Sequence, residues 1–266
     1  MKPLCAVYAV FSYLTFLAVF FYAIGFTGNL VVPKSIDSGA PGPLLPALIV
    51  DLLLLGAFAI QHSVMARPAF KRWWTRYVPP PIERSTYVLF ASLVLLLLYV
   101  AWRPLPAPVW TVTSPEARGL LWALFGFGWI LVLLSTCMIS HFELFGLKQA
   151  MIRRLDPDAP AALTTRYLYN YVRHPIMLGF LIAFWATPTM TQGHLLFTIM
   201  TTGYILIGIA LEERDLIAAF GDRYRAYRAR VPALLPWRAG RRSNTAGAPG
   251  AVTDGRQGPL VGGPGA

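Results

Sequence analysis

Charged side chains are scarce in this chain. Of its 266 residues, 13% are Asp, Glu, Lys or Arg, whereas 56% are hydrophobic. A soluble globular domain usually has about 25% charged residues. The shortage argues against a soluble domain, and together with long apolar runs it indicates a protein that crosses a membrane several times.

Cysteine is also scarce. Cys5 and Cys137 both fall within apolar runs, and their separation matches no metal-binding or redox spacing. We therefore predict no metal site, and we expect both cysteines to be small buried core residues.

The apolar runs predict an all-α, polytopic bundle of membrane helices. Four continuous runs cover roughly residues 4–26, 43–64, 86–102 and 119–140, and a fifth stretch, roughly 175–211, is interrupted at "TPTMTQGH". A membrane helix needs about 20 apolar residues, so the fifth stretch fits a tight hairpin of two shorter helices. We expect five or six transmembrane segments, with six slightly favoured. The first run is too long for the apolar region of a signal peptide and reads as a membrane helix.

Acidic residues are fewer than basic ones, 12 against 23, and the net charge is +11. A path of six helices places 20 of the 23 basic residues on one side of the membrane and leaves Lys34, Arg103 and Arg118 on the other. Basic loops remain in the cytoplasm, so we expect an inner-membrane protein with both termini cytoplasmic. Topology and contact with anionic lipid then explain the charge excess, and no nucleic-acid partner is predicted.

The chain is expected to have three parts. Residues 1–140 form N-terminal transmembrane helices, residues 141–239 form a core with the motifs "RHP" and "EE", and residues 240–266 form a disordered tail rich in Gly, Pro and Ala. Within the core, "EERDLIAAFGDRYRAYRARVPALLPW" reads as a basic amphipathic helix that Pro232 stops.

Polar residues gather at one predicted membrane face. Helix two ends in "QHS" with His62, helix four ends in "SHFE" with His141, helix five begins at "RHP" with His174, and helix six ends in "EERD". Polar side chains at such positions are costly and usually functional. We therefore expect a functional site where these segments meet, at the cytoplasmic ends of the helices.

Several polar residues also have ordinary structural explanations. His62 could be an interfacial anchor, and His141 beside Glu143 could act in a helix-end cap. Asp51, inside helix two, is expected to pair with another helix or to line a cavity. His194 lies at the opposite face and is expected to be an interfacial residue.

Glu212 and Glu213 raise a question of charge balance. They end a predicted descending helix, and a helix C-terminus carries partial negative charge. We therefore expect cations close to them: Arg173, Arg214 or a bound ligand. The neighbouring tyrosines are typical of a membrane interface, but beside acids they could instead hold a cationic ligand. These tyrosines are Tyr167, Tyr169, Tyr171, Tyr224 and Tyr227.

The order of the C-terminal motifs resembles a known family. "VRHPIMLGF" is followed, after a helical hairpin, by "EERDLIAAFGDRYRAYRARVPALLP". This pattern is similar to the isoprenylcysteine carboxyl methyltransferase superfamily, integral membrane enzymes that use S-adenosylmethionine. Further stretches, "FTGNLVVPKSIDSG", "FAIQHSVMARPAFKRWW", "PPIERSTYVL" and "HFELFGLKQ", resemble its membrane-bound bacterial methanethiol S-methyltransferases. The resemblance covers roughly residues 1–237.

The resemblance implies both an activity and a cofactor. It implies S-adenosylmethionine-dependent methylation of methanethiol, a small volatile thiol, to dimethyl sulfide at the cytoplasmic membrane face. It also implies that residues of the two motifs line the cofactor pocket. The corresponding cofactor-binding residues in this sequence are Tyr171, His174, Glu212, Glu213, Arg214, Tyr224 and Tyr227.

Methylation of a thiol requires the thiolate, but an alkyl thiol is mostly protonated at neutral pH. A base, or positive charge that lowers the pKa of the thiol, is therefore needed. His62 is the preferred base because helix two brings it to the correct face, and His141 is the second choice. Arg84 or Arg173 could stabilise the thiolate.

Two alternatives to thiol methylation remain open from the sequence. The first is a methyltransferase that acts on a lipid or prenylcysteine acceptor. The second is a non-catalytic membrane protein related to denitrification-associated proteins, which could bind haem or an accessory partner through His62 and His141. A transporter is disfavoured, because only Asp51 lies deep in an apolar segment and no inverted repeat is visible.

Overall fold

The computed structural model describes residues 2–151, 165 and 167–235. Five of its helices are long and apolar enough to cross a membrane. They are α1 (Lys2–Gly28), α2 (Leu44–Met65), α4 (Glu83–Ala101), α5 (Pro115–Ile139) and α9 (Gln192–Phe220). The predicted all-α, polytopic membrane bundle is confirmed. The predicted tail, 240–266, lies outside the described residues.

The stretch predicted as a hairpin of two shorter helices is one short helix and one long helix. α8 covers Pro175–Trp185, only 11 residues, whereas α9 has 29. Eleven residues rise about 16 Å, roughly half of the hydrocarbon thickness of a bilayer. The predicted interruption is confirmed, but the prediction that both helices are short is wrong, because α9 continues well past residue 211.

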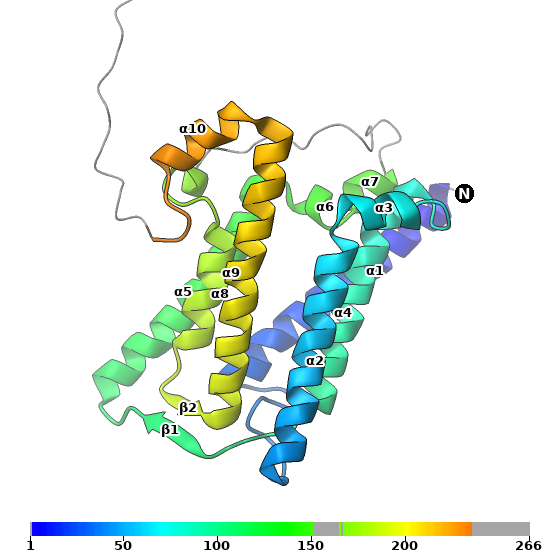
Figure 1. The fold of residues 1–266 in the computed structure, drawn as a ribbon. Coiled ribbons are helices and arrows are strands. Elements are labelled where there is room, and N and C mark those ends of the chain that lie inside the picture. The colour runs from blue at the N-terminus through cyan, green and yellow to red at the C-terminus, as the bar shows by residue number, and fades with distance from the viewer. Residues whose placement is uncertain (1, 152–164, 166, 236–266) are drawn as a thin grey trace, which may run out of the picture.

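The C-terminal segment is also two helices and not one. α9 runs on to Phe220, and α10 (Asp222–Arg230) follows a break at Gly221. Gly221 has φ +56°, a left-handed conformation that glycine adopts without strain. The prediction of one amphipathic helix is therefore wrong. Figure 1 shows α10 turning across the end of the bundle.

Short elements connect the long helices. They are α3 (Pro68–Trp74), η1 (Pro80–Ile82), α6 (His141–Leu144), α7 (Leu147–Met151) and η2 (Tyr167–Asn170). At the opposite end of the bundle, β1 (Pro108–Thr111) pairs antiparallel with β2 (Thr189–Thr191). This ribbon ties the segment between α4 and α5 to the segment between α8 and α9 (Figure 1).

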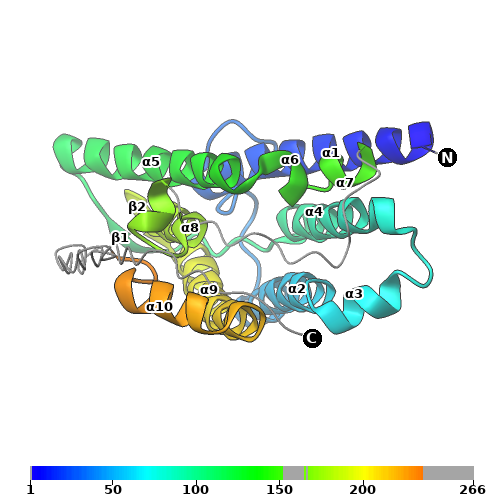
Figure 2. The ribbon, with the colours of Figure 1, turned by 90° about the horizontal axis from the view of Figure 1, so that it is seen from above.

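The long helices pack in two groups. α4 packs against both α1 and α2, and α8 packs against both α5 and α9. Seen along the bundle in Figure 2, α4 lies between α1 and α2, and α8 lies between α5 and α9. α2 also contacts α9 and so joins the groups.

α5 and α8 approach until their backbones touch. A Cβ atom added to Gly179 would lie 2.7 Å from the carbonyl oxygen of Gly128, and one added to Gly128 would lie 2.6 Å from that of Gly179. Small residues permit such close packing of membrane helices. The short helix α8 is therefore held in place by α5.

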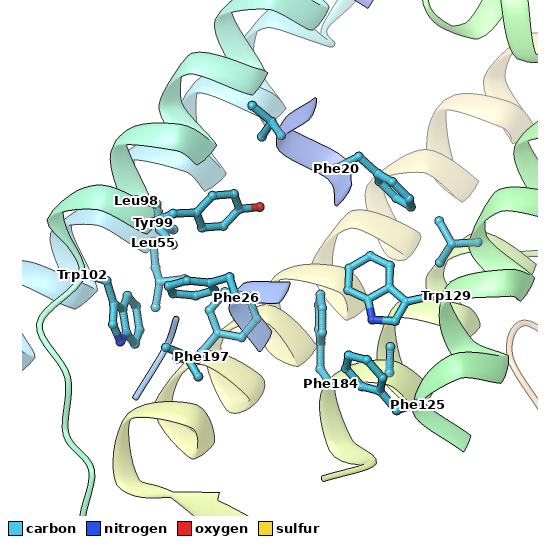
Figure 3. Packing of buried hydrophobic residues seen from close by; sticks show 14 of the residues in the cluster. Phe20, Phe26, Leu55, Leu98, Tyr99, Trp102, Phe125, Trp129, Phe184 and Phe197 are labelled. Atoms are coloured by element: carbon cyan, nitrogen blue, oxygen red, sulfur yellow. The ribbon is translucent and has the colours of Figure 1, made fainter. Parts of the chain in front are cut away.

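Aromatic side chains fill the core between the helices (Figure 3). Phe20 of α1 meets Trp129 of α5 edge-on, with ring centroids 5.3 Å apart, and Phe184 meets Phe197 at 5.1 Å. Edge-on contacts of this kind are favourable beyond the apolar area that they bury. The core thus connects α1 with the α5–α8–α9 group.

The two cysteines do not belong to this core. Cys137 is exposed and Cys5 is partly exposed, and neither is in a disulfide. The prediction that both are buried core residues is wrong. Cys137 lies on the outer surface of α5 and Cys5 on that of α1, where lipid would surround them.

Candidate functional site

The site begins with a buried ion pair between the start of α8 and the last third of α9. The guanidinium of Arg173 donates from Nε and Nη2 to Oε1 of Glu213, at 2.8 and 2.5 Å. Both side chains are 8% exposed. Nε of Arg228, on α10, lies 3.1 Å from the second oxygen of Glu213. Both carboxylate oxygens of Glu213 therefore face cations.

Arg173 also fixes the end of α10. Its Nη1 donates to the carbonyl oxygens of Arg228, at 3.1 Å, and of Val231. These are carbonyl groups at the helix C-terminus, where the helix itself supplies no donor. The chain then folds back, and the backbone N–H of Arg173 bonds to the carbonyl of Pro232 at 2.9 Å. Arg173 thus joins α8, α9 and α10.

His174 stands between the two acids of the "EE" motif. Its Nε2 lies 3.2 Å from Oε1 of Glu213, and its Nδ1 lies 3.6 Å from Oε2 of Glu212. The His174 side chain is 5% exposed, whereas that of Glu212 is 49% exposed. Glu212 is therefore the more accessible acid of the pair.

The cations expected near the two acids are present, but the predicted reason for them is wrong. Glu212 and Glu213 do not end a helix, because α9 continues for about two more turns to Phe220. Burial of Glu213 makes the cations necessary instead. Arg214 is largely exposed and lies 3.9 Å from Asp215, away from this pair.

Two tyrosines of α10 complete this cluster. Tyr227 donates a hydrogen bond to the carbonyl of Tyr169 at 2.6 Å. Tyr224 is 1% exposed, and its hydroxyl has no hydrogen-bond partner of good geometry among the described residues. Burial, with a smaller effect of Glu213, raises the pKa of Tyr224 to about 12, although nearby Arg173 opposes this shift. By contrast, Tyr171 is exposed on the surface.

His62 lies in a second cluster, on the side of α9 that faces α2. The hydroxyl of Tyr87 lies 3.0 Å from its Nε2 and 3.1 Å from its Nδ1. The rings of Phe58 and Tyr204 also contact the imidazole. Tyr204 in turn lies 3.2 Å from the hydroxyl of Ser63.

Both ring nitrogens of His141 are engaged within the protein. Nε2 lies 2.8 Å from the hydroxyl of Tyr13, and Nδ1 lies 2.9 Å from that of Thr136. Burial lowers the pKa of His141, which favours the neutral ring. Close by, Arg84 donates to the carbonyl of Glu143 at 2.9 Å. These contacts connect α1, α4 and the end of α5.

The sequence predicted one convergent site, and the structure separates the residues into distinct clusters. Tyr204, beside His62, and Glu213, beside Arg173, are nine positions apart on α9, which corresponds to about half a turn of rotation and about 13 Å along the axis. The two clusters therefore occupy opposite sides of α9. Glu212 lies about 80° from Tyr204 around the axis of α9. It therefore lies between the His62 cluster and the Arg173–Glu213 cluster.

Sequence reasoning missed several partners. From the sequence, Arg228 is one of the basic residues on the cytoplasmic side, and no local pattern predicts its contact with Glu213. Tyr87 lies within the stretch "PPIERSTYVL", but no local pattern predicts its contact with His62, 25 residues away. Within the described part of the chain, no group of three or more His, Cys, Asp or Glu could hold a metal ion.

The chain is similar to known proteins over most of its length. The family model described as NnrU protein matches residues 50–230. The Methanethiol S-methyltransferase of Mycobacterium tuberculosis is 59% identical over 237 residues, which cover 89% of this chain and 97% of that protein. Methanethiol S-methyltransferase 1 of Bradyrhizobium diazoefficiens is 55% identical over 238 residues, which cover 89% of this chain and 84% of that protein.

A more distant relative carries a different name. Nurim of Bos taurus is 34% identical over 182 residues, which cover 65% of this chain and 69% of that protein. No solved structure matches the chain. The extent of the matches shows that the chain belongs to the NnrU protein family and, within it, to the group of methyltransferase enzymes that includes the first two relatives.

Proposed function

We propose that the chain methylates methanethiol to dimethyl sulfide and takes the methyl group from S-adenosylmethionine. The names of relatives that match nearly the whole chain support the substrate. The observation that carries the cofactor assignment is the half-exposed carboxylate of Glu212, which lies beside His174. The adjacent Glu213 is buried and paired with Arg173 and Arg228.

The residues of this cluster fit the chemistry of such a cofactor. S-adenosylmethionine has a positive sulfur, a cationic amine, a carboxylate and ribose hydroxyls, and when bound it supplies an electrophilic methyl group. In our proposal Glu212 accepts hydrogen bonds from the cationic or hydroxyl groups. The hydroxyl of Tyr224, which has no hydrogen-bond partner among the described residues, supplies a further polar contact.

The remaining predicted cofactor residues have supporting roles in this proposal. Glu213, His174 and Tyr227 form the frame that holds Glu212 and α10 in place. Arg214 and Tyr171 are exposed, and in this proposal they meet the carboxylate or the adenine of the cofactor.

His62 is the base in this proposal. The imidazole takes the thiol proton at a ring nitrogen, and the Tyr87 hydroxyl, which contacts the same ring, orients it. The surrounding rings of Phe58 and Tyr204 form an apolar wall that suits a small thiol. The reaction space would lie beside Glu212, between the two groups of helices, because Glu212 stands between the two clusters on α9.

The contacts of the other three candidates favour positioning roles. Arg173 is occupied by Glu213 and by the end of α10. His141 has a partner at each nitrogen, and Arg84 holds the backbone near Glu143. We therefore prefer His62 to His141 as the base. We expect Arg84 and Arg173 to hold the surrounding segments in position and not to contact the thiolate.

The proposed location is the inner membrane, with both termini and the two clusters towards the cytoplasm. The bias of Lys and Arg to this end of the helices supports it. A small apolar thiol can partition into the bilayer and reach the site from the side. A fluorescent protein that folds only in the cytoplasm, fused after the C-terminus, tests the orientation: fluorescence is expected, and its absence in a stably inserted fusion would overturn it.

The activity is tested with purified protein in detergent, supplied with S-adenosylmethionine and methanethiol, by measuring dimethyl sulfide in the headspace. We expect product from the wild type and at least about a hundredfold less from His62→Ala, in line with loss of a general base. Binding of S-adenosylmethionine, measured separately, should survive in that variant. Cofactor binding without product in the wild type would point to a lipid or prenylcysteine acceptor, and no cofactor binding would favour a non-catalytic protein.

A further inference from the structure

A cavity of about 620 Å³ lies at the end of the bundle opposite to the Arg173–Glu213 pair. Its walls come from the loop after α1, the first turns of α2 and the end of α4, which meet in the lower part of Figure 1. Cavities that hold small ligands usually measure about 300–1,000 Å³. The size therefore suits a ligand, and the proposed methyl transfer makes no use of this end of the molecule.

Two cations line the cavity, Lys34 and Arg103. The ammonium of Lys34 donates to the carbonyl of Val100 at 2.7 Å. The guanidinium of Arg103 has no ion pair or hydrogen bond to any described residue. Burial, and next the positive charge of Arg103, lower the pKa of Lys34, although Asp51 opposes them. The two cations are thus close enough to repel each other, and an anion between them would relieve that repulsion.

A neutral donor in the same wall also lacks a partner. Trp102 lines the cavity and is fully buried, and its indole nitrogen has no hydrogen-bond partner among the described residues. The ring packs edge-on against Phe26 and Phe197, with centroids 6.0 Å away in each case. Figure 3 shows the indole nitrogen on the edge of the ring turned away from Phe26. A buried N–H without an acceptor is costly, so a ligand oxygen here would be stabilising.

The walls of the cavity are held in place before any ligand arrives. The hydroxyl of Tyr22 bonds to both the carbonyl and the N–H of Lys34, at 2.9 and 3.1 Å. Ile36, fully buried, anchors the same loop to Phe26 through its backbone. Asp51 accepts the backbone N–H of Arg103 at 2.8 Å. A site that is already ordered loses little conformational entropy when it binds.

We propose that this cavity binds a phosphate group, such as the phosphodiester of a phospholipid headgroup, through Lys34, Arg103 and the indole N–H of Trp102. Arg and Lys are the usual partners of phosphate, since both donate charge-assisted hydrogen bonds. With the carboxylate of Asp51 close by, the two cations leave one net positive charge, which matches the single negative charge of a phosphodiester.

The position of the cavity favours a lipid over a free ion. It lies where α1 and α4 end and α2 begins, at the level where headgroups meet a membrane-spanning bundle. Pro33, Pro46 and Val50 supply apolar wall beside the cations. A glycerol backbone and the start of its acyl chains would lie against such a wall, whereas inorganic phosphate would leave it wet.

The test uses the full protein, stripped of lipid in a maltoside detergent, and a short-chain phosphatidylglycerol as the probe. Binding is measured by native mass spectrometry and by titration calorimetry, in parallel with inorganic phosphate and with a diacylglycerol of equal chain length. We expect the phosphatidylglycerol to bind, and the diacylglycerol to bind at least about tenfold more weakly. Inorganic phosphate that binds as tightly would support the phosphate site but assign it to a free anion.

Two variants and one control keep the test specific. Arg103→Gln removes a guanidinium without contacts to described side chains, so the fold should be kept, and Lys34→Met removes the second cation. Each should weaken binding of the phosphatidylglycerol about tenfold. Arg118→Gln is the matched control, because Arg118 lies at the same end, donates to the carbonyl of Val112 and does not line the cavity. Equal affinity in Arg103→Gln, the control and the wild type would overturn the proposal, as would no preference over diacylglycerol.

Discussion

Arg173 and Glu213 are 40 positions apart in the sequence, and two nitrogens of the Arg173 guanidinium bond to one carboxylate oxygen of Glu213 in nearly dry surroundings. The same guanidinium caps α10, and the neighbouring His174 contacts Glu212 as well as Glu213. The two adjacent acids therefore differ in kind. Glu213 is part of the frame, whereas Glu212 has a carboxylate that a ligand can reach.

Replacement of Glu213 by Ala should destabilise the protein strongly. It leaves the guanidinium of Arg173 buried without its counter-charge, and breaking a buried pair in this way costs about 3–5 kcal/mol. The measurement is the thermal unfolding midpoint in detergent. Arg228→Gln is the milder control, since Arg228 is half exposed and its contact with Glu213 should contribute much less. Equal losses in the two variants would show that burial of the pair does not decide its contribution.

Replacement of Glu212 by Gln should leave stability nearly unchanged and weaken cofactor binding. The side chain is half exposed and the imidazole of His174 lies 3.6 Å from it, so the unfolding midpoint should stay close to that of the wild type. Affinity for S-adenosylmethionine should fall about tenfold or more, since a hydrogen bond to a charged group contributes about 1.5–3 kcal/mol. Equilibrium dialysis with labelled cofactor measures it. A variant that is less stable but binds normally would refute the assignment of Glu212 to the cofactor.

The sequence predicts the long elements and the ends at which polar residues gather, because both depend on local composition. An apolar run of about 20 residues has few alternatives to a membrane helix. The ion pair of Arg173 with one of the two acids was also predictable from the sequence, since a buried acid needs a cation.

The separation of the clusters was not predictable in the same way. It depends on the rotation of α9 and on its continuation to Phe220, which a window of hydropathy does not reveal. The short α8 is a similar case, because its place is set by contact between Gly128 and Gly179 on two different helices. The partners of His62 and His141 are likewise distant in sequence, at separations of 25 and 128 positions for Tyr87 and Tyr13.

The contact between α5 and α8 leads to a third prediction. Gly179→Ala places a methyl group 2.7 Å from a carbonyl oxygen and 2.9 Å from a backbone nitrogen of α5, so the two helices must separate. Overpacking of this kind costs about 1–3 kcal/mol, and the unfolding midpoint should fall. Gly126→Ala is the matched control on α5, because an added methyl group there meets nothing within 4 Å. It should be neutral or slightly stabilising, since Ala favours the helix. A neutral Gly179→Ala would mean that the two backbones are not in contact.

His141 should make stability depend on pH near neutrality. Burial lowers its pKa in the folded protein, so between the ordinary value of about 6.5 and the lower folded value only the unfolded chain takes up the proton. The stabilisation is therefore complete above about pH 6.5 and is lost as the pH falls through the folded pKa. Protonation also makes both ring nitrogens donors, which disturbs the bonds to Tyr13 and Thr136.

The unfolding midpoint of the wild type and of His141→Gln, followed from about pH 8 to pH 5, tests this assignment. The variant should lose less stability than the wild type as the pH falls, so the two curves should converge. Tyr13→Phe keeps the imidazole but removes one hydrogen bond, and it should lower stability by about 0.5–1.5 kcal/mol above pH 6.5. Curves for wild type and His141→Gln that stay parallel would show that other groups carry the pH dependence, and that His141 titrates alike in the folded and unfolded chains.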